Sequence, residues 1–176
     1  MFQHKSEEDL IRSARDGDGG AFADLLRPLY SSSFRVALAL LHDPGEAEDA
    51  VQEAAFKAWR KLGMVRRGAP LRPWFLAIVA NQCRSVMRKS WWSAQTLEEP
   101  IADVRHPDPD ARIDLNRALK DLDHDERLVL VLRYYLDLPF EEIAQIMGIS
   151  TKAARSRNER AIRRLRPIFP LREAVT

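Results

Sequence analysis

Residues 138–166 read LPFEEIAQIMGISTKAARSRNERAIRRLR, and they decide the fold predicted for the second half of the chain. The spacing of their apolar residues predicts a helix from about Pro139 to Met147 and a second helix from Thr151 to about Arg166. Gly148 begins the short turn between them, because glycine adopts the backbone conformations that such turns need. Two helices joined in this way are typical of a helix-turn-helix, a motif that places its second helix in the DNA major groove.

The second helix of this motif has an apolar side and a basic side. The predicted core between the two helices consists of Ile143, Ala144, Met147, Ile149, Ala154, Ala161 and Leu165. The opposite side faces solvent in this prediction, so its cations can neutralise phosphates while the first turns of the helix reach base edges. This outward side consists of Lys152, Ser156, Arg157, Arg160, Arg163 and Arg164.

A second amphipathic helix is predicted in the first half of the chain. It starts at Asp43-Pro44-Gly45-Glu46, where proline and acids suit a first turn, and runs to about Leu62. Its predicted inward residues are Val51, Ala55, Ala58 and Leu62. Its outward residues are Glu46, Asp49, Gln52, Glu53 and Phe56, a mixture that suits docking to a basic protein surface. The alternative is that Phe56 is buried against a neighbouring helix.

A third helix is predicted from Trp74 to about Ser90, preceded by a cationic loop that carries Arg66, Arg67 and Arg72. Its apolar arc consists of Phe75, Leu76, Val79, Cys83, Val86 and Met87, which makes Cys83 a core residue rather than a nucleophile. Its polar face consists of Asn81, Arg84, Ser85 and Arg88. Arginines, an amide and the flanking Trp74, Trp91 and Trp92 suit single-stranded DNA, although Trp74 is better explained as core.

Charge and composition divide the chain further. The net charge of its 176 residues is only +2, yet residues 61–92 hold seven bases and no acid, and residues 43–53 hold five acids and no base. Residues 93–111 contain three prolines and five acids with little apolar periodicity, which indicates an extended connection. We therefore expect an all-α fold: two small helical domains, residues 1–92 and 113–176, joined by a flexible acidic linker at 93–112.

Several classes of protein are disfavoured by composition. One cysteine and four scattered histidines offer no spacing for a metal site, and no cofactor motif is present. We find no phosphate loop, catalytic triad or paired-carboxylate pattern, so we do not expect an enzyme. Because the sequence contains neither a long apolar run nor a secretory signal, we expect a soluble, cytoplasmic protein without membrane insertion.

Three segments, in this order, resemble the extracytoplasmic-function (ECF) sigma factors of bacterial RNA polymerase. Residues 43–59, DPGEAEDAVQEAAFKAW, are similar to the helix of that family that binds core polymerase. Residues 71–89, LRPWFLAIVANQCRSVMRK, are similar to its reader of the -10 promoter element, and residues 141–166 to its reader of the -35 element. The resemblance covers nearly the whole chain and makes its two domains sigma regions 2 and 4.

The resemblance implies a partner for each surface. Core polymerase would bind Asp49, Gln52, Glu53 and Phe56. The -10 element would bind Arg66, Arg67, Arg72, Asn81, Arg84 and Arg88. The -35 element would bind Arg155, Ser156, Arg157 and Arg160, together with Lys152 from the outward side of the same helix. It also implies an anti-sigma factor that holds the protein inactive, and a mechanism of binding and strand separation without covalent chemistry.

Some residues depart from the family pattern. Ser85 stands where the family usually has aspartate, and Ala153-Ala154 replace a common Thr-Val pair. Asn158 replaces an apolar residue on the inward side, so it is either a satisfied core amide or a DNA contact. The alternative function is a helix-turn-helix regulator that binds duplex operator DNA without core polymerase, which would leave the acidic helix and the basic third helix without a role.

Overall fold

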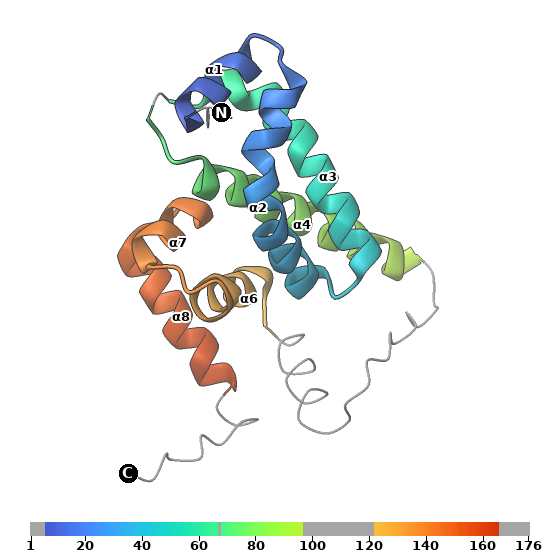
Figure 1. Cartoon of the computed structure of the whole chain (residues 1–176). Coiled ribbons are helices and arrows are strands. Elements are labelled where there is room, and N and C mark those ends of the chain that lie inside the picture. The colour runs from blue at the N-terminus through green and yellow to red at the C-terminus, as the bar shows by residue number, and fades with distance from the viewer. Residues whose placement is uncertain (1–5, 67, 97–121, 166–176) are drawn as a thin grey trace. The chain divides into compact units, whose positions relative to one another are not determined.

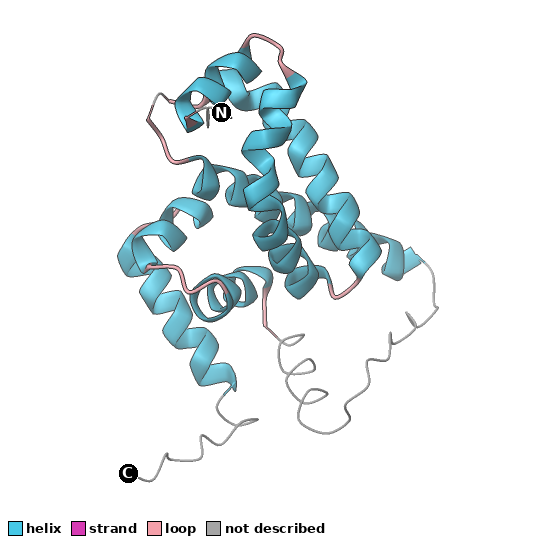
Figure 2. Cartoon of the chain, in the orientation of Figure 1, coloured by secondary structure: helices cyan, strands magenta, loops and turns pink. Residues whose placement is uncertain are grey.

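The computed structural model describes residues 6–66, 68–96 and 122–165, and side chains as far as Lys89 in the second of these ranges. Every regular element in these ranges is helical, which confirms the all-α prediction (Figure 2). The chain divides into two compact units, Met1–Trp91 and Trp92–Thr176, which we describe separately. The first four residues of the predicted linker, 93–96, are helical and not extended, and its remaining residues, 97–112, lie outside the described residues.

The first unit consists of α1 (Glu7–Arg15), α2 (Gly19–Leu41), α3 (Pro44–Lys61), the 3-10 turn η1 (Leu62–Met64) and α4 (Leu71–Thr96), as Figure 1 shows. Local chemistry explains where the first three helices begin. The side chains of Ser6, Asp18 and Asp43 each accept a hydrogen bond from the backbone N–H three residues ahead. Because such caps satisfy amides that have no partner within the helix, they define its start, and the predicted start at Asp43 is confirmed.

Small side chains let α2 and α3 pack closely along their length. On α3 the buried residues are Ala47, Ala50, Val51, Ala54 and Ala58. The predicted inward stripe was therefore wrong at Ala55, which is half-buried, while Ala54 is fully covered. The pattern alone did not reveal this rotation, since an alanine is equally compatible with either side of a helix.

The core of the first unit continues into α4. Phe75, Leu76, Val79 and Cys83 are buried as predicted, whereas Val86 and Met87 are half-buried. Trp74 packs on a cluster that contains Leu25, Leu62 and Leu71, which supports its interpretation as core. The helix begins three residues earlier than predicted, at Leu71, so Arg72 lies in its first turn and not in the preceding loop.

The second unit contains α6 (His124–Leu130), the π-helical segment η2 (Val131–Tyr135), α7 (Phe140–Met147) and α8 (Thr151–Leu165). The predicted helix-turn-helix is confirmed in α7 and α8. Gly148 ends α7 with φ 66°, in the left-handed region that favours glycine, and the next amide, of Ile149, donates to the Ala144 carbonyl at 3.0 Å.

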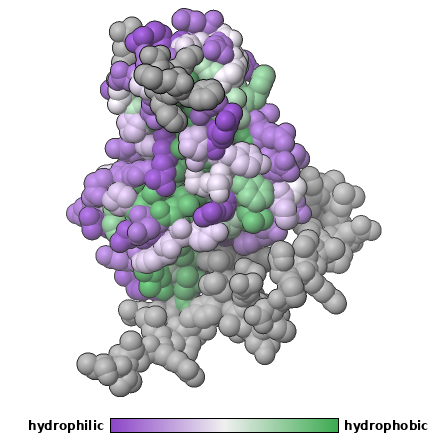
Figure 3. All heavy atoms as spheres, viewed as in Figure 1, coloured by the Kyte–Doolittle hydropathy of each residue, from purple (hydrophilic) through white to green (hydrophobic). Residues whose placement is uncertain are grey.

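The core of the helix-turn-helix differs from the prediction on both helices, and Leu165 of α8, which was predicted as core, is only half-buried. Ile143, Ala144 and Ile146 are buried, whereas Met147 and Ile149 are only half-buried. Because α7 packs against η2 as well as α8, its buried arc includes Ile146. Ala154 and Ala161 are fully buried on α8, as predicted. Outside these cores, hydrophilic residues and smaller apolar areas are interspersed on the face shown in Figure 3.

Candidate protein and nucleic-acid interfaces

One face of α3 combines carboxylates with an exposed aromatic ring. Asp49, Gln52 and Glu53 are all exposed, and Phe56 retains 57% of its surface. The guanidinium of Arg60 lies 5.9 Å from the Phe56 ring centroid, at the distance of a cation–π contact. The alternative interpretation, that Phe56 is buried against a neighbouring helix, is therefore wrong. A large apolar side chain held in water beside acids is a surface suited to a protein partner.

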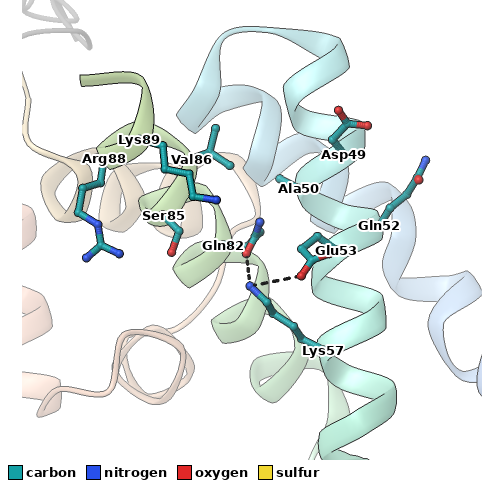
Figure 4. A pocket seen from close by; sticks show the side chains of 10 residues that line it. All are labelled: Asp49, Ala50, Gln52, Glu53, Lys57, Gln82, Ser85, Val86, Arg88 and Lys89. Atoms are coloured by element: carbon teal, nitrogen blue, oxygen red, sulfur yellow. Dashed lines mark hydrogen bonds and ion pairs between the residues drawn. The ribbon is translucent and has the colours of Figure 1, made fainter. Parts of the chain in front are cut away.

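A cleft of about 840 Å³ separates the acidic face of α3 from α4 (Figure 4). Lys57 spans the two helices: its Nζ lies 3.6 Å from Glu53 Oε1 and donates to Gln82 Oε1 at 2.5 Å. Arg88 and Lys89 line the α4 side. The sequence analysis missed Lys57, because only the fold brings this residue of α3 next to a residue of α4 twenty-five positions away.

The exposed face of α4 presents hydrogen-bonding groups in an ordered row. Asn81, Arg84 and Arg88 are exposed, and Arg84 Nη1 donates to Asn81 Oδ1 at 3.2 Å. Ser85, where the family usually has an acid, is half-buried and its hydroxyl donates to the Asn81 backbone carbonyl at 3.1 Å. The predicted polar face is thus present, and Ser85 leaves it without a carboxylate.

The cationic loop before α4 is described only in part. Arg66 is exposed, Arg67 lies outside the described residues, and Arg72 is half-buried in the first turn of α4. Met64 in η1 is 82% exposed, although its apolar side chain gave no functional signal in the sequence. The side chains of Trp91 and Trp92, singled out as possible stacking groups, also lie outside the description.

The exposed face of α8 lies opposite its buried alanines. Lys152, Ser156, Glu159 and Arg160 are exposed. Arg155 is exposed too, but two residues of α7 hold it: its guanidinium lies 4.8 Å from the Phe140 ring centroid and 3.3 Å from Glu141 Oε1. A guanidinium held against an aromatic plane loses less conformational freedom when it binds, so Arg155 is partly pre-ordered.

Arg157 does not lie on the outward side as predicted. Its Nη1 is 2.8 Å from Asp125 Oδ2 of α6, and only 24% of the arginine side chain is exposed. The reason is helical geometry: Arg157 follows the buried Ala154 by three residues and precedes the buried Ala161 by four, so it borders the inward arc. In the same way Arg164 reaches Glu126 at 2.5 Å, and these two ion pairs connect α8 to α6.

Asn158 is a core amide and not an exposed DNA contact. Only 5% of the residue is exposed, and its Nδ2 donates to the Tyr134 hydroxyl at 3.2 Å. This hydrogen bond links α8 to η2. The sequence pattern did not predict that these two elements lie in contact. Of the two interpretations that the sequence left open, burial selects the core amide over the DNA contact, but the amide is satisfied only in part: within the described residues its Oδ1 is buried without a hydrogen-bond partner.

The buried thiol of Cys83 is unreactive as a nucleophile in this fold. Burial raises the pKa of its thiol from 9.0 to about 12, because the thiolate would lose its hydration. In the residues that the structure describes, no group of histidine, cysteine and carboxylate side chains is placed to hold a metal ion. None of the helices described is long and apolar enough to cross a bilayer.

In a comparison with known proteins, both units match regions of the same protein family. Residues 23–93 match the family described as Sigma-70 region 2, and residues 118–167 match Sigma-70 region 4. The RNA polymerase sigma factor CarQ of Myxococcus xanthus is 31% identical over 88% of this chain and 92% of its own length. The ECF RNA polymerase sigma factor SigL of Mycobacterium tuberculosis is 30% identical over 85% of this chain and 92% of its own.

A solved structure agrees with these relatives. The sigma factor RpoE of Bartonella quintana, crystallised with the anti-sigma factor NepR, is 27% identical to this chain. It superimposes with a TM-score of 0.71 over 86% of this chain and 98% of the sigma factor chain.

Proposed function

We propose that this chain, which belongs to the ECF family of RNA polymerase sigma factors, uses one face of α3 for core polymerase and faces of α4 and α8 for promoter DNA. A sigma factor binds core polymerase, recognises the -10 and -35 elements and starts transcription. The same proposal places its action in the cytoplasm, with the polymerase, and gives it no covalent chemistry of its own. The alternative of a regulator that acts without core polymerase has no support among these relatives.

The proposed polymerase surface consists of Asp49, Gln52, Glu53 and Phe56 on α3. The observation that carries this assignment is the exposure of Phe56, 57%, in the middle of an acidic helix face. A partner helix with basic side chains would cover the ring and pair with Asp49 and Glu53. Burying one phenylalanine side chain contributes roughly 1.5–3 kcal/mol of transfer free energy, so the ring would be the main apolar anchor.

The proposed -10 surface is the exposed row Asn81, Arg84 and Arg88, joined by the loop that contains Arg66 and Arg67 and by Arg72 at the start of α4. Arginine guanidiniums bind phosphates and stack on unpaired bases, while an amide can pair with a base edge. Separating the strands costs a few kcal/mol per extruded base, which these contacts must offset. Arg88 also lines the cleft between α3 and α4, so one unit can bind both polymerase and single-stranded DNA.

The proposed -35 surface consists of Lys152, Arg155, Ser156 and Arg160 on α8. We assign Arg157 a positioning role instead, because its guanidinium is engaged by Asp125 and only 24% of its side chain is exposed, whereas the side chain of Arg155 is 56% exposed. An arginine such as Arg155, pre-ordered by Phe140, suits bidentate recognition of guanine in the major groove. Each cation that contacts a phosphate makes the slope of log binding constant against log salt concentration more negative by about 0.9.

An anti-sigma factor is the remaining proposed partner. The RpoE structure contains such an inhibitor, NepR. The acidic face of α3 and the basic faces of α4 and α8 are all open in this chain and would be available for an inhibitor to cover. We therefore expect one protein to compete with both polymerase and promoter.

The test is reconstituted transcription with bacterial core polymerase on fragmented genomic DNA, with the 5′ ends of transcripts sequenced. Discrete start sites that share two upstream motifs and need both core and this chain are expected. The double variant Asp49→Lys with Glu53→Lys should weaken core binding at least tenfold. The matched control reverses the exposed acids Asp16 and Asp24, outside the proposed surface, and should bind core normally. Equal core binding by both variants would remove α3 from the interface.

A further inference from the structure

We infer that Glu159 on α8 determines the base preferred at one position of the -35 element, by accepting a hydrogen bond from the amino group of a cytosine. This inference rests on the proposed function, in which the exposed face of α8 enters the major groove. Glu159 would thus contribute to sequence selectivity, whereas the basic residues around it would contribute mainly to affinity for DNA.

Glu159 lies near the middle of the exposed face of α8. It is exposed, and it follows exposed Lys152 by seven residues and Ser156 by three, so helical geometry places all three on one side. The buried residues Ala154 and Ala161 point the other way. A macromolecule that contacts Lys152 and Ser156 would therefore also meet Glu159.

The carboxylate is unusual in this environment. Residues 152–165 contain six bases, and Glu159 is the one acid among them. Arg155 and Arg163, four residues before and after it, are at the spacing of helical ion pairs. Yet within the described residues the arginines of α8 form their ion pairs with α6 and α7: Arg155 with Glu141, Arg157 with Asp125 and Arg164 with Glu126. Glu159 is thus left to face solvent.

The negative charge of Glu159 can make DNA binding depend on base sequence. A carboxylate that enters a DNA groove is repelled by phosphates and loses hydration, so it weakens binding unless a donor replaces the lost water. The amino group of cytosine is such a donor in the major groove, and glutamate is a known acceptor for it. Guanine and thymine present acceptors at their edges and would add repulsion. Adenine holds its amino donor beside the N7 acceptor, which would repel a carboxylate that approached that donor. Glu159 would therefore penalise most bases and tolerate cytosine.

The test uses holoenzyme assembled from core polymerase and the full chain. The template is a promoter from the transcription experiment above, with each base pair of its -35 element varied in turn. Wild-type holoenzyme should prefer cytosine at one position by about fivefold to tenfold, as expected for one good hydrogen bond. Glu159→Gln should move that preference toward adenine, because glutamine pairs with the adenine edge. Glu159→Ala should bind more tightly overall and lose the preference.

The matched control is Glu8→Gln, the same chemical change at an exposed acid of α1. It should leave all base preferences unchanged. If Glu159→Gln raises activity equally on every template, the side chain is only a surface charge and the inference is overturned. If wild-type holoenzyme shows no base preference anywhere in the -35 region, the proposed function of α8 fails, and this inference fails with it.

Discussion

Arg157 joins α8 to α6 through its ion pair with Asp125, and this role can be measured apart from DNA binding. Both side chains are partly covered, at 24% and 31% exposure, so their ion pair is less screened than a surface pair. We expect Arg157→Ala and Asp125→Ala each to lower the free energy of unfolding. Their coupling energy in a double-mutant cycle should be about 1 kcal/mol. Urea unfolding followed by circular dichroism measures it.

Additive effects of the two Arg157 and Asp125 substitutions would contradict this role. The control is the exposed i,i+3 pair of Arg12 and Asp9, with side chains 74% and 52% accessible. Its coupling should be within error of zero, because exposed pairs contribute little.

Because of Cys83, the free energy of unfolding should depend on pH in the alkaline range. Burial raises its pKa to about 12, whereas the unfolded chain loses the proton near 9.0. Between these values the folded state binds more protons than the unfolded state, so stability falls as pH rises. Wild-type protein should lose stability relative to Cys83→Ala by up to about 1.4 kcal/mol per pH unit above pH 9.

The measurement is urea unfolding of both proteins at several values from pH 7.5 to 10.5, under reducing conditions. Cys83→Ala will be less stable at neutral pH, because it leaves space in the core. The informative quantity is the difference between the two proteins as pH rises. A difference that stays constant across the range would show that the thiol does not titrate as its burial requires.

At the scale of elements, the turn between α7 and α8 depends on one backbone conformation. Gly148 has φ 66°, and an added Cβ would meet no atom within 4 Å. The cost of Gly148→Ala is therefore backbone strain alone, about 1 kcal/mol. Gly148→Asn should cost less, because asparagine tolerates the left-handed region better.

Thermal unfolding by circular dichroism tests the turn, with Gly63→Ala as the matched control. Gly63 is also free of close neighbours, but its φ is not positive. That substitution should therefore be neutral or slightly stabilising. Equal destabilisation by the two alanine variants would mean that the left-handed backbone conformation of Gly148 does not set the cost.

At the scale of the whole molecule, two DNA-binding units on one chain should act as a bivalent binder once core polymerase holds them. Each unit has its own core and its own basic face. Linked binding of two elements exceeds either alone by about 10² or more in favourable geometry. Holoenzyme should therefore bind a promoter with only one intact element roughly a hundredfold more weakly.

Fluorescence anisotropy on intact and single-element promoters, with and without core, measures this bivalency. The chain without core should bind the intact promoter weakly, with little difference between one element and two. Strong binding of the free chain to the -35 element alone would instead favour a regulator that needs no polymerase.

Local chemistry made much of this molecule readable from its sequence. Helix starts such as Asp43 and the turn at Gly148 depend on neighbouring backbone groups, so a linear pattern contains the necessary information. The same holds for the acidic, basic and apolar faces of α3, α4 and α8, because helical periodicity relates sequence spacing directly to sides of a helix. The order of three motifs was sufficient to identify the family.

Tertiary structure decided which side chains are available for binding. Arg157 and Arg160 look alike in the sequence, yet Arg157 is engaged by Asp125 and Arg160 is exposed. The side-chain nitrogen of Asn158 donates to Tyr134 of η2, and Phe56 is exposed to solvent. These outcomes depend on which helix packs beside which residue. The hydrophobic effect that drives such packing has no direction, so residue spacing within one helix does not specify its neighbours.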